Sequence, residues 1–367
     1  MILNCHNLFV IELHDPPSRI AGYCRQSYGW MSSTDAKDAP RVEISFPDDL
    51  KPKAAFRCCG RTFRDGDHVF WQAPNHALVE YPLLQLLEKQ DRVSVMASPA
   101  IASDSLFHTF VCQILRYLLI RRGVAFMHAS SFGWGSKVMV CPAWREVGKT
   151  GVLLLALQDG ALYYGDDLAL VSRDGTLYPW LSPLHIFDHH LRAFPHLWRH
   201  FTLGDRVAIA VRRVAGLADK ALHDPLAVLA NPLKALVSKT RFSLQIKAED
   251  AFPLARGLWP APVTHCCLLS AIAGQTPATL DPCEPAVVGH AQHYALKQEF
   301  AISREIEDEV AGLWHGEHVG PLRAELAEET RIIADAMRGV QCRQFMIPRG
   351  THWDAQWSAM RSWLGCD

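Results

Sequence analysis

A segment near the middle of the chain has the residue types of a phosphate-binding loop. Residues 143–150 match the pattern GxxxxGK[ST], except that alanine stands at the first glycine. Such a loop presents backbone N–H groups at a helix N-terminus, a lysine for the β- and γ-phosphates and a hydroxyl for Mg²⁺. The alternative is an ordinary strand-to-helix turn with an exposed lysine. The candidate nucleotide-binding residues are Ala143, Trp144, Arg145, Glu146, Val147, Gly148, Lys149 and Thr150.

Two neighbouring acids and one histidine form a second group of candidates. Asp166 and Asp167 follow a short predicted strand, where carboxylates can hold Mg²⁺ or accept a proton from an attacking hydroxyl. Taken alone, this acid pair is more typical of a solvated turn. His128 closes the strand before the loop, and a lone histidine there is usually a hydrogen-bonded core residue. The prediction of a site therefore rests on the three features together.

The order and spacing of these features resemble the C-terminal kinase domain of the HPr kinase/phosphorylase family. The resemblance rests on Met127-His128-Ala129, on the loop and on Tyr164-Gly165-Asp166-Asp167, and it covers about residues 123–186. The hairpin at 174–179 also looks like one in diverged members. The resemblance implies an α/β or α+β P-loop domain with a mixed sheet, preceded here by a smaller β-rich region.

The resemblance also implies a role for each residue. Lys149 would bind the β- and γ-phosphates of ATP, while Thr150 and Asp167 would hold Mg²⁺. Asp166 would accept the proton of the substrate hydroxyl, with His128 assisting, so that Asp166, His128 and Lys149 form the catalytic set. Diverged relatives often act in natural-product or modified-peptide pathways. We therefore expect a kinase that phosphorylates a peptide or protein serine or a small molecule.

Two departures from the family pattern motivate a different function. Ala143 and Glu146 stand where the family has glycines, which tolerate positive φ and allow phosphate to approach closely. The alternative is therefore a catalytically weak nucleotide-binding adaptor or regulator. A third option, a related fold such as that of the phosphoenolpyruvate carboxykinases, would need a second metal site that the sequence does not show. HPr itself is not the favoured substrate, because no clear copy of the segment that holds it is present.

Hydrophobic periodicity predicts the elements that must position these residues. Residues 1–104 are predicted to form a β-rich region, with short strands at 8–13, 41–46 and 54–58 and a hairpin at Asp65-Gly66. We assign 105–300 to the kinase domain and 301–367 to a helical C-terminal extension. Within the kinase domain we expect a helix at 106–122, strands at 124–129 and 137–141 around a turn at 132–135, a helix at 148–157, a strand at 161–164 and a hairpin with strands at 168–171 and 176–178. Later elements are a helix at 322–339 and a strand at 344–347.

Three other clusters have simpler explanations. A histidine run contains two i,i+4 pairs, the spacing of a helical metal site, but Pro195 interrupts it and no acidic helper is present. The run His265-Cys266-Cys267 is more typical of a buried strand, and the tryptophans near the C-terminus of core or interface. The histidines are His185, His189, His190, His196 and His200, and the tryptophans are Trp353, Trp357 and Trp363.

Composition limits the partners and the compartment. The 367 residues are 49% hydrophobic and carry a formal net charge of -1, so a strong attraction to nucleic acid or to an anionic membrane is not expected. The 11 cysteines are odd in number and lack a CxxC spacing, which indicates reduced thiols and favours the cytoplasm. The N-terminus has no basic region typical of a signal peptide. The sequence leaves a homo-oligomer open.

Overall fold

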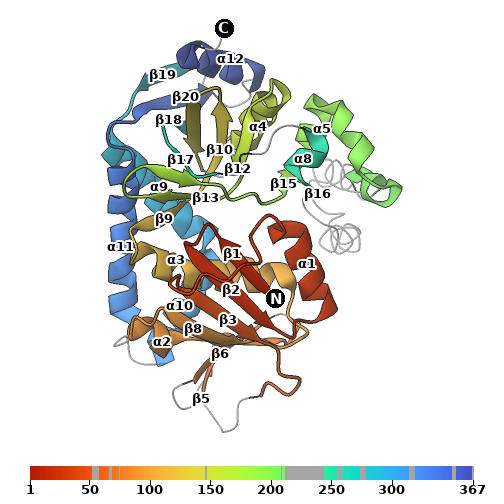
Figure 1. Cartoon of the computed structure of the whole chain (residues 1–367), viewed down its shortest axis with the longest axis vertical. Coiled ribbons are helices and arrows are strands. Elements are labelled where there is room, and N and C mark those ends of the chain that lie inside the picture. Colours follow the sequence, from red (N-terminus) through yellow and green to blue (C-terminus); the bar gives the residue numbers. More distant parts are fainter. Residues whose placement is uncertain are drawn as a thin grey trace, which may run out of the picture.

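The chain folds as a mixed α/β protein with several sheets (Figure 1). The α/β class predicted from the sequence is therefore confirmed. Among the described residues, no helix combines the length and the hydrophobicity needed to span a bilayer. This computed structural model describes residues 1–51, 58–65, 68–73, 75–144, 147–207, 209–210, 244–253, 257, 259–272, 278–313, 319–348 and 353–365.

The N-terminal part contains a sheet that is partly parallel, covered on one side by a helix. Its strand order is β1-β2-β3-β8, and only the β1–β2 pair is antiparallel. The strands predicted at 8–13 and 41–46 are confirmed, but the helix α1 was missed because its apolar stripe is short. The elements are β1 (Ile2–Cys5), β2 (Phe9–His14), α1 (Ser18–Tyr28), β3 (Arg41–Ser45) and β8 (Arg92–Met96).

A small antiparallel sheet lies at the far end of this part. β5 and β6 confirm the predicted hairpin, but the register pairs Asp65 with His68, so Asp65 belongs to β5 and the turn predicted at Asp65-Gly66 is displaced by one residue. Residues 66–67 lie outside the described residues. A further strand predicted at 54–58 also falls largely outside them. The elements are β4 (Cys58–Cys59), β5 (Thr62–Asp65), β6 (His68–Gln72), β7 (Leu78–Tyr81) and α2 (Leu83–Leu87).

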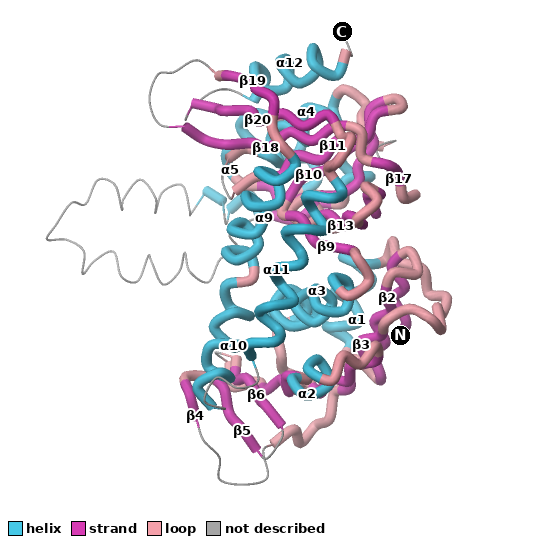
Figure 2. The backbone as a smooth tube through the Cα atoms, turned by 90° about the vertical axis from the view of Figure 1, so that its left-hand side faces the viewer, coloured by secondary structure: helices cyan, strands magenta, loops and turns pink. Residues whose placement is uncertain are grey.

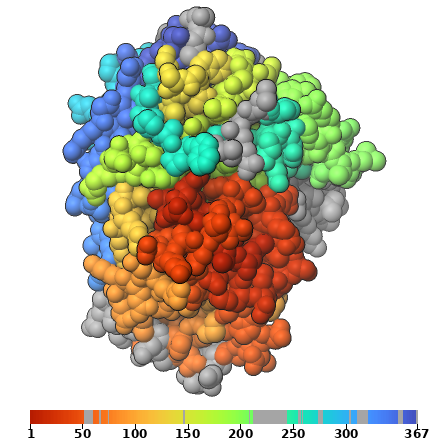
Figure 3. All heavy atoms as spheres, viewed as in Figure 1, coloured from red at the N-terminus to blue at the C-terminus, as the bar shows by residue number. Residues whose placement is uncertain are grey.

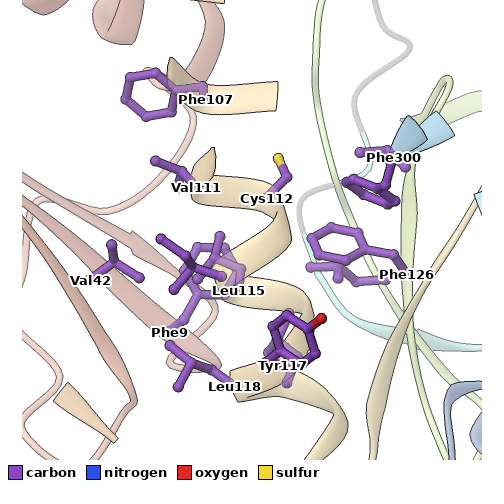
Figure 4. Close-up of a cluster of buried hydrophobic side chains, with 14 of the residues drawn as sticks. Phe9, Val42, Phe107, Val111, Cys112, Leu115, Tyr117, Leu118, Phe126 and Phe300 are labelled. Atoms are coloured by element: carbon purple, nitrogen blue, oxygen red, sulfur yellow. The ribbon is translucent and has the colours of Figure 1, made fainter. Parts of the chain in front are cut away.

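A buried helix joins the two parts of the molecule. It begins as a π-helix, η1 (Ser105–Val111), and continues as α3 (Cys112–Ile120), all nine residues of which are buried. Figure 4 shows Phe9 and Val42 on one side of this helix and Phe126 and Phe300 on the other. The predicted helix at 106–122 is thus confirmed, and it is buried on all its faces because other elements cover both sides.

The phosphate-loop segment belongs to a six-stranded mixed sheet of order β12-β10-β11-β18-β20-β19. β11 runs parallel to β18, and β18 runs parallel to β20. β20 comes from the last part of the chain, so the residues after 301 supply a strand to this sheet. The elements are β10 (Ala129–Trp134), β11 (Lys137–Pro142), α4 (Lys149–Gln158), β12 (Leu162–Gly165), β18 (His265–Ile272), β19 (Thr279–Pro282) and β20 (Gln341–Pro348).

The chain changes sheets at His128. The strand before it, β9, pairs with β13 in a second sheet of order β17-β14-β13-β9, whereas β10 pairs with β11 and β12. The strand predicted at 124–129 is confirmed over Val124–Met127, but it ends before His128. The turn predicted at 132–135 is wrong, because the turn lies at Gly135-Ser136 and Phe132 is buried in β10. The elements of the second sheet are β9 (Val124–Met127), β13 (Ala169–Ser172), β14 (Thr176–Tyr178) and β17 (Ala261–Pro262).

Long helices run beside both parts. α11, at the left edge in Figure 1 and across the middle in Figure 2, packs on α9 and α3. A bidentate ion pair between Arg116 and Glu329, with N–O distances of 2.8 and 2.5 Å, is buried where α3 meets α11. The predicted helix at 322–339 is confirmed. These helices are α9 (Pro285–Glu299), α10 (Ala301–Leu313), α11 (Val319–Ala336) and α12 (Trp353–Leu364).

The remaining described elements lie beside α4. In Figure 3 the N-terminal residues, in red, cover the middle of the visible face, and the yellow residues, which include α4, lie above them. The elements are β15 (Leu184–Ile186), α5 (Asp188–Ala193), the 3₁₀ helix η2 (Pro195–His200), β16 (Leu244–Ile246) and α8 (Ala248–Ala251).

Candidate functional site

The phosphate-loop candidate connects β11 to α4, as predicted. Gly148 has a φ of +106°, a left-handed conformation that residues with a Cβ rarely adopt, and α4 begins directly after it. Ala143 is buried, forms a parallel bridge to Leu269 and donates its N–H to the His128 carbonyl at 3.2 Å. The alanine therefore occupies a packed position at the end of β11. Trp144 is exposed, and the candidates Arg145 and Glu146 lie outside the described residues.

Lys149 is held inside the site. Its side chain is almost fully buried, with Nζ 2.7 Å from Oδ1 of Asp167 and 3.2 Å from Nε2 of His128. Burial alone would lower the pKa of Lys149, but the charges of Asp167 and Asp166 outweigh it and raise the pKa. The lysine is therefore a cation, and the alternative of an exposed lysine in an ordinary turn is wrong.

Thr150 contacts the first aspartate of the pair. Its hydroxyl donates to Oδ2 of Asp166 at 2.9 Å, and Ser182 donates to the backbone carbonyl of Asp166 at 3.0 Å. Asp166 is only 1% exposed, so the alternative of a solvated turn is wrong for this residue. Within the described part of the chain, its Oδ1 has no hydrogen-bond partner. Burial, with the charge of Asp167, raises the pKa of Asp166 to about 7.

Asp167 has a different environment from its neighbour. Its φ is +66°, and its side chain is 39% exposed. Burial opposes its charge, but the Lys149 ammonium holds the pKa of Asp167 well below its usual range. Two adjacent carboxyls with widely separated pKa values are typical of sites in which one carboxyl carries the charge and the other can carry a proton.

His128 lies between the loop and the lysine. Its Nδ1 is 2.7 Å from the Ala143 carbonyl, so this nitrogen carries the hydrogen and Nε2 accepts from Lys149. Burial and the charge of Lys149 lower the pKa of His128, which favours the neutral ring. His128 is thus a hydrogen-bonded buried residue, as the simpler explanation expected, and it also contacts the candidate lysine directly.

Two residues of α9 that the sequence did not single out complete these contacts. Gln292 bonds to the backbone of His128, and Glu299 Oε2 lies 3.6 Å from His128 Nε2. Gln292 and His128 are 164 positions apart. Neither residue belongs to a recognisable motif. An amide or a carboxylate on a helix is usually a surface residue, so the sequence alone does not assign either one to a site.

The C-terminal helix α12 packs along α4. A Cβ added to Gly151 would lie 2.4 Å from the Trp353 ring, so the ring lies directly against the first turn of α4. At the other end of α4, Trp357 donates from Nε1 to Asp159 at 2.7 Å. Trp357 is buried, which confirms the core assignment for this tryptophan.

The histidine run and the His265-Cys266-Cys267 run are the other candidate metal ligands of the sequence. Among the described residues, no group of three or more His, Cys, Asp or Glu side chains is arranged to hold a metal ion. His185 lies in β15, so it does not share a helix with His189. Burial and His189 lower the pKa of His190 to about 3, which leaves its ring neutral. His265-Cys266-Cys267 is buried in β18, as predicted.

Comparison with known proteins adds no identification. No protein-family model matches the sequence, and no curated protein matches it.

Proposed function

We propose that this chain is an HPr-kinase-like P-loop phosphotransferase that moves the γ-phosphate of ATP to a hydroxyl of a peptide or protein serine or of a small molecule. One observation carries the proposal. Lys149, Thr150, the aspartate pair and His128 come from three separate segments, yet they form one continuous set of contacts at the start of α4. This is the set that phosphoryl transfer uses for positioning and charge stabilisation.

The start of α4 is suited to bind phosphate. The first N–H groups of a helix have no partner within the helix, and the helix dipole favours an anion there. Lys149, the first residue of α4, has its ammonium group 2.7 Å from Asp167. A triphosphate would offer this ammonium group new anionic partners, so that Lys149 exchanges Asp167 for the β- and γ-phosphates.

The residues present also fit Mg²⁺. The Thr150 hydroxyl and Oδ1 of Asp166 are hard oxygen donors, and the second of these is buried without a hydrogen-bond partner among the described residues. Mg²⁺ is usually held by one or two carboxylates together with substrate phosphates and waters. Thr150 and Asp166 would therefore hold an ion that binds together with the nucleotide, and that ion would neutralise charge on the phosphates.

The contacts favour a division of labour between the two aspartates opposite to the one that the resemblance implies. A proton acceptor must reach the incoming hydroxyl. Asp166 is buried against Thr150, whereas the side chain of Asp167 is 39% exposed. We therefore assign the support of Mg²⁺ to Asp166 and the acceptance of the hydroxyl proton to Asp167. Once Lys149 turns to the phosphates, the main cause of the low pKa of Asp167 is removed.

A transfer assay with two matched variants tests the proposal. Protein, Mg²⁺ and ATP labelled at the γ-phosphate are incubated with serine peptides and hydroxyl metabolites, with water as the default acceptor. Asp167→Asn should leave ATP affinity unchanged and reduce transfer by about 10²–10⁴-fold. Asp166→Asn should weaken the Mg²⁺-dependent part of ATP binding. Asp174→Asn, in the hairpin after β13, is the control and should change neither.

The same assay distinguishes the proposed kinase from the alternative, a nucleotide-binding adaptor or regulator. A protein that binds ATP with Mg²⁺ but labels no acceptor and releases no phosphate would be a nucleotide-binding adaptor. Full transfer by both Asp166→Asn and Asp167→Asn would contradict the kinase assignment.

A further inference from the structure

The backbone of His128 lies where the chain leaves one sheet and enters another. β9 pairs with β13 and ends at Met127, whereas β10 begins at Ala129 and pairs with β11 and β12. At this break the His128 carbonyl still accepts from the Ala143 N–H at 3.2 Å, whereas the His128 N–H is not paired with either sheet. Because an unsatisfied buried N–H is costly, another group must accept its hydrogen bond.

Gln292 supplies this acceptor from the middle of α9. Its Oε1 accepts from the His128 N–H at 2.6 Å, and its Nε2 donates to the His128 carbonyl at 3.4 Å. The Gln292 side chain is fully buried. One carboxamide therefore accepts from the His128 N–H and also donates to the His128 carbonyl, which accepts from the Ala143 N–H as well.

The ring of His128 is fixed by a separate contact. Nδ1 is bonded to the Ala143 carbonyl at 2.7 Å, and this leaves Nε2 directed at Lys149 Nζ, 3.2 Å away. The Gln292 amide holds the backbone together with the Ala143 N–H, and the Ala143 carbonyl holds the ring. The position of Nε2 relative to Lys149 depends on both, and misplacement by about 1 Å in such a site can cost roughly 10²-fold in rate.

We propose that Gln292 is a positioning residue for phosphoryl transfer: its carboxamide accepts from the His128 N–H, which no strand pairs, and so sets where Nε2 meets Lys149. The catalytic consequence rests on the proposed function, whereas the placement of His128 does not. Glu299, from the last turn of the same helix, lies 3.6 Å from Nε2, so α9 contacts both the backbone and the ring of this histidine.

The test replaces Gln292 by methionine, which has a similar size but cannot make the two hydrogen bonds. Gln113→Met is the matched control, because Gln113 is also buried and hydrogen-bonded, to Glu307 and Tyr117, but belongs to α3. Gln292→Glu keeps the acceptor for the His128 N–H and serves if the methionine variant does not fold.

The first readout does not need activity. In protein labelled with ¹⁵N-histidine, the imidazole signals of His128 are identified by their loss in His128→Gln. We expect the Nδ1–H form in the wild type, a changed His128 signal in Gln292→Met and an unchanged one in Gln113→Met. An unchanged His128 signal in Gln292→Met would overturn the proposal.

The second readout is transfer. Gln292→Met should lower kcat by about tenfold or more while KM for ATP changes less than about threefold. In a His128→Gln background it should cause no further loss, because both changes remove the same contact. Equal losses of kcat in Gln292→Met and Gln113→Met, or additive losses in the double variant, would show a merely structural role. If the wild-type protein shows no transfer, the proposed function is overturned. The imidazole signals then test only whether Gln292 places His128.

Discussion

Nζ of Lys149 lies 2.7 Å from Oδ1 of Asp167, so the candidate phosphate-binding lysine is paired with one of the two candidate carboxylates. The pair links the two halves of the proposed reaction, since one residue would bind the phosphate and the other would receive the proton. A nucleotide that takes over the lysine would release the aspartate. Binding of the first substrate would thereby prepare the site for the second.

Removing the lysine should destabilise the folded protein. Lys149→Met should lower the free energy of unfolding by about 1–2 kcal/mol, less than for a fully buried pair because solvent screens the half-exposed Asp167. The loss should shrink at acid pH, because a carboxyl with a depressed folded pKa contributes stability only while it is ionised. Urea unfolding at pH 7 and pH 3 measures both effects. Lys89→Met, at a side chain that is 69% exposed, should change stability by less than about 0.5 kcal/mol.

Asp166→Asn should stabilise the protein at neutral and alkaline pH. The folded pKa of about 7 lies above the ordinary value of 3.8, so in the wild type the contribution of Asp166 is fully present at low pH and is lost as the pH rises to 7. The gain in the free energy of unfolding of Asp166→Asn over wild type should grow by about 1.4 kcal/mol per pH unit between the two pKa values, 3.8 and about 7, and then level off. Unfolding curves at pH 4, 6 and 8 check it. A variant that loses stability relative to wild type as the pH rises would contradict the buried, protonatable carboxyl.

Gly151→Ala should disturb the packing of α12 on α4. The new Cβ would lie 2.4 Å from the Trp353 ring, and such overpacking typically costs about 1–3 kcal/mol. Gly22→Ala is the control, because Gly22 is also helical and has nothing within 4 Å of an added Cβ, so alanine there should stabilise by about 0.5–1 kcal/mol. Thermal unfolding compares them. Restoration of stability in Gly151→Ala/Trp353→Leu would show that the ring is the obstacle, and equal stability of the two single variants would refute the contact.

Glu329→Gln should weaken the junction between the two parts of the molecule. Arg116 and Glu329 are both buried, and removing one charge leaves the other unpaired, which costs about 3–5 kcal/mol. Glu328→Gln removes a neighbouring carboxylate whose partner, Arg173, is 47% exposed, and should cost less than about 1 kcal/mol. Guanidinium unfolding of both variants measures the difference. Similar losses would mean that the buried pair does not stabilise the junction.

Local sequence signals predicted the elements that carry the motif. The phosphate-loop helix, the strand that ends at the aspartate pair and the hairpin at 169–178 all appear where apolar runs and turn residues place them. The change of sheet at His128 was not predicted, because apolar residues continue on both sides of it and periodicity does not reveal which strands pair. Strand order likewise depends on contacts between distant segments, as when β20 pairs with β18.

The sequence predicted only part of the candidate site, again because local patterns do not reveal contacts between distant segments. Lys149, Thr150, Asp166 and Asp167 lie within one short stretch whose pattern carries chemical meaning. Gln292 and Trp353 reach the site from helices far along the chain, and their types alone do not distinguish a buried partner from an ordinary helical residue. The burial of Lys149 was missed because its partner is set by the fold rather than by its neighbours in sequence.

Calorimetric titration of the purified chain with ATP, with and without Mg²⁺, tests the central claim most directly. The account predicts saturable binding that Mg²⁺ strengthens, a loss of at least about tenfold in affinity for Lys149→Met and unchanged affinity for the exposed control Lys89→Met. An absence of ATP binding by the wild type, or equal affinities of the wild type and Lys149→Met, would contradict it.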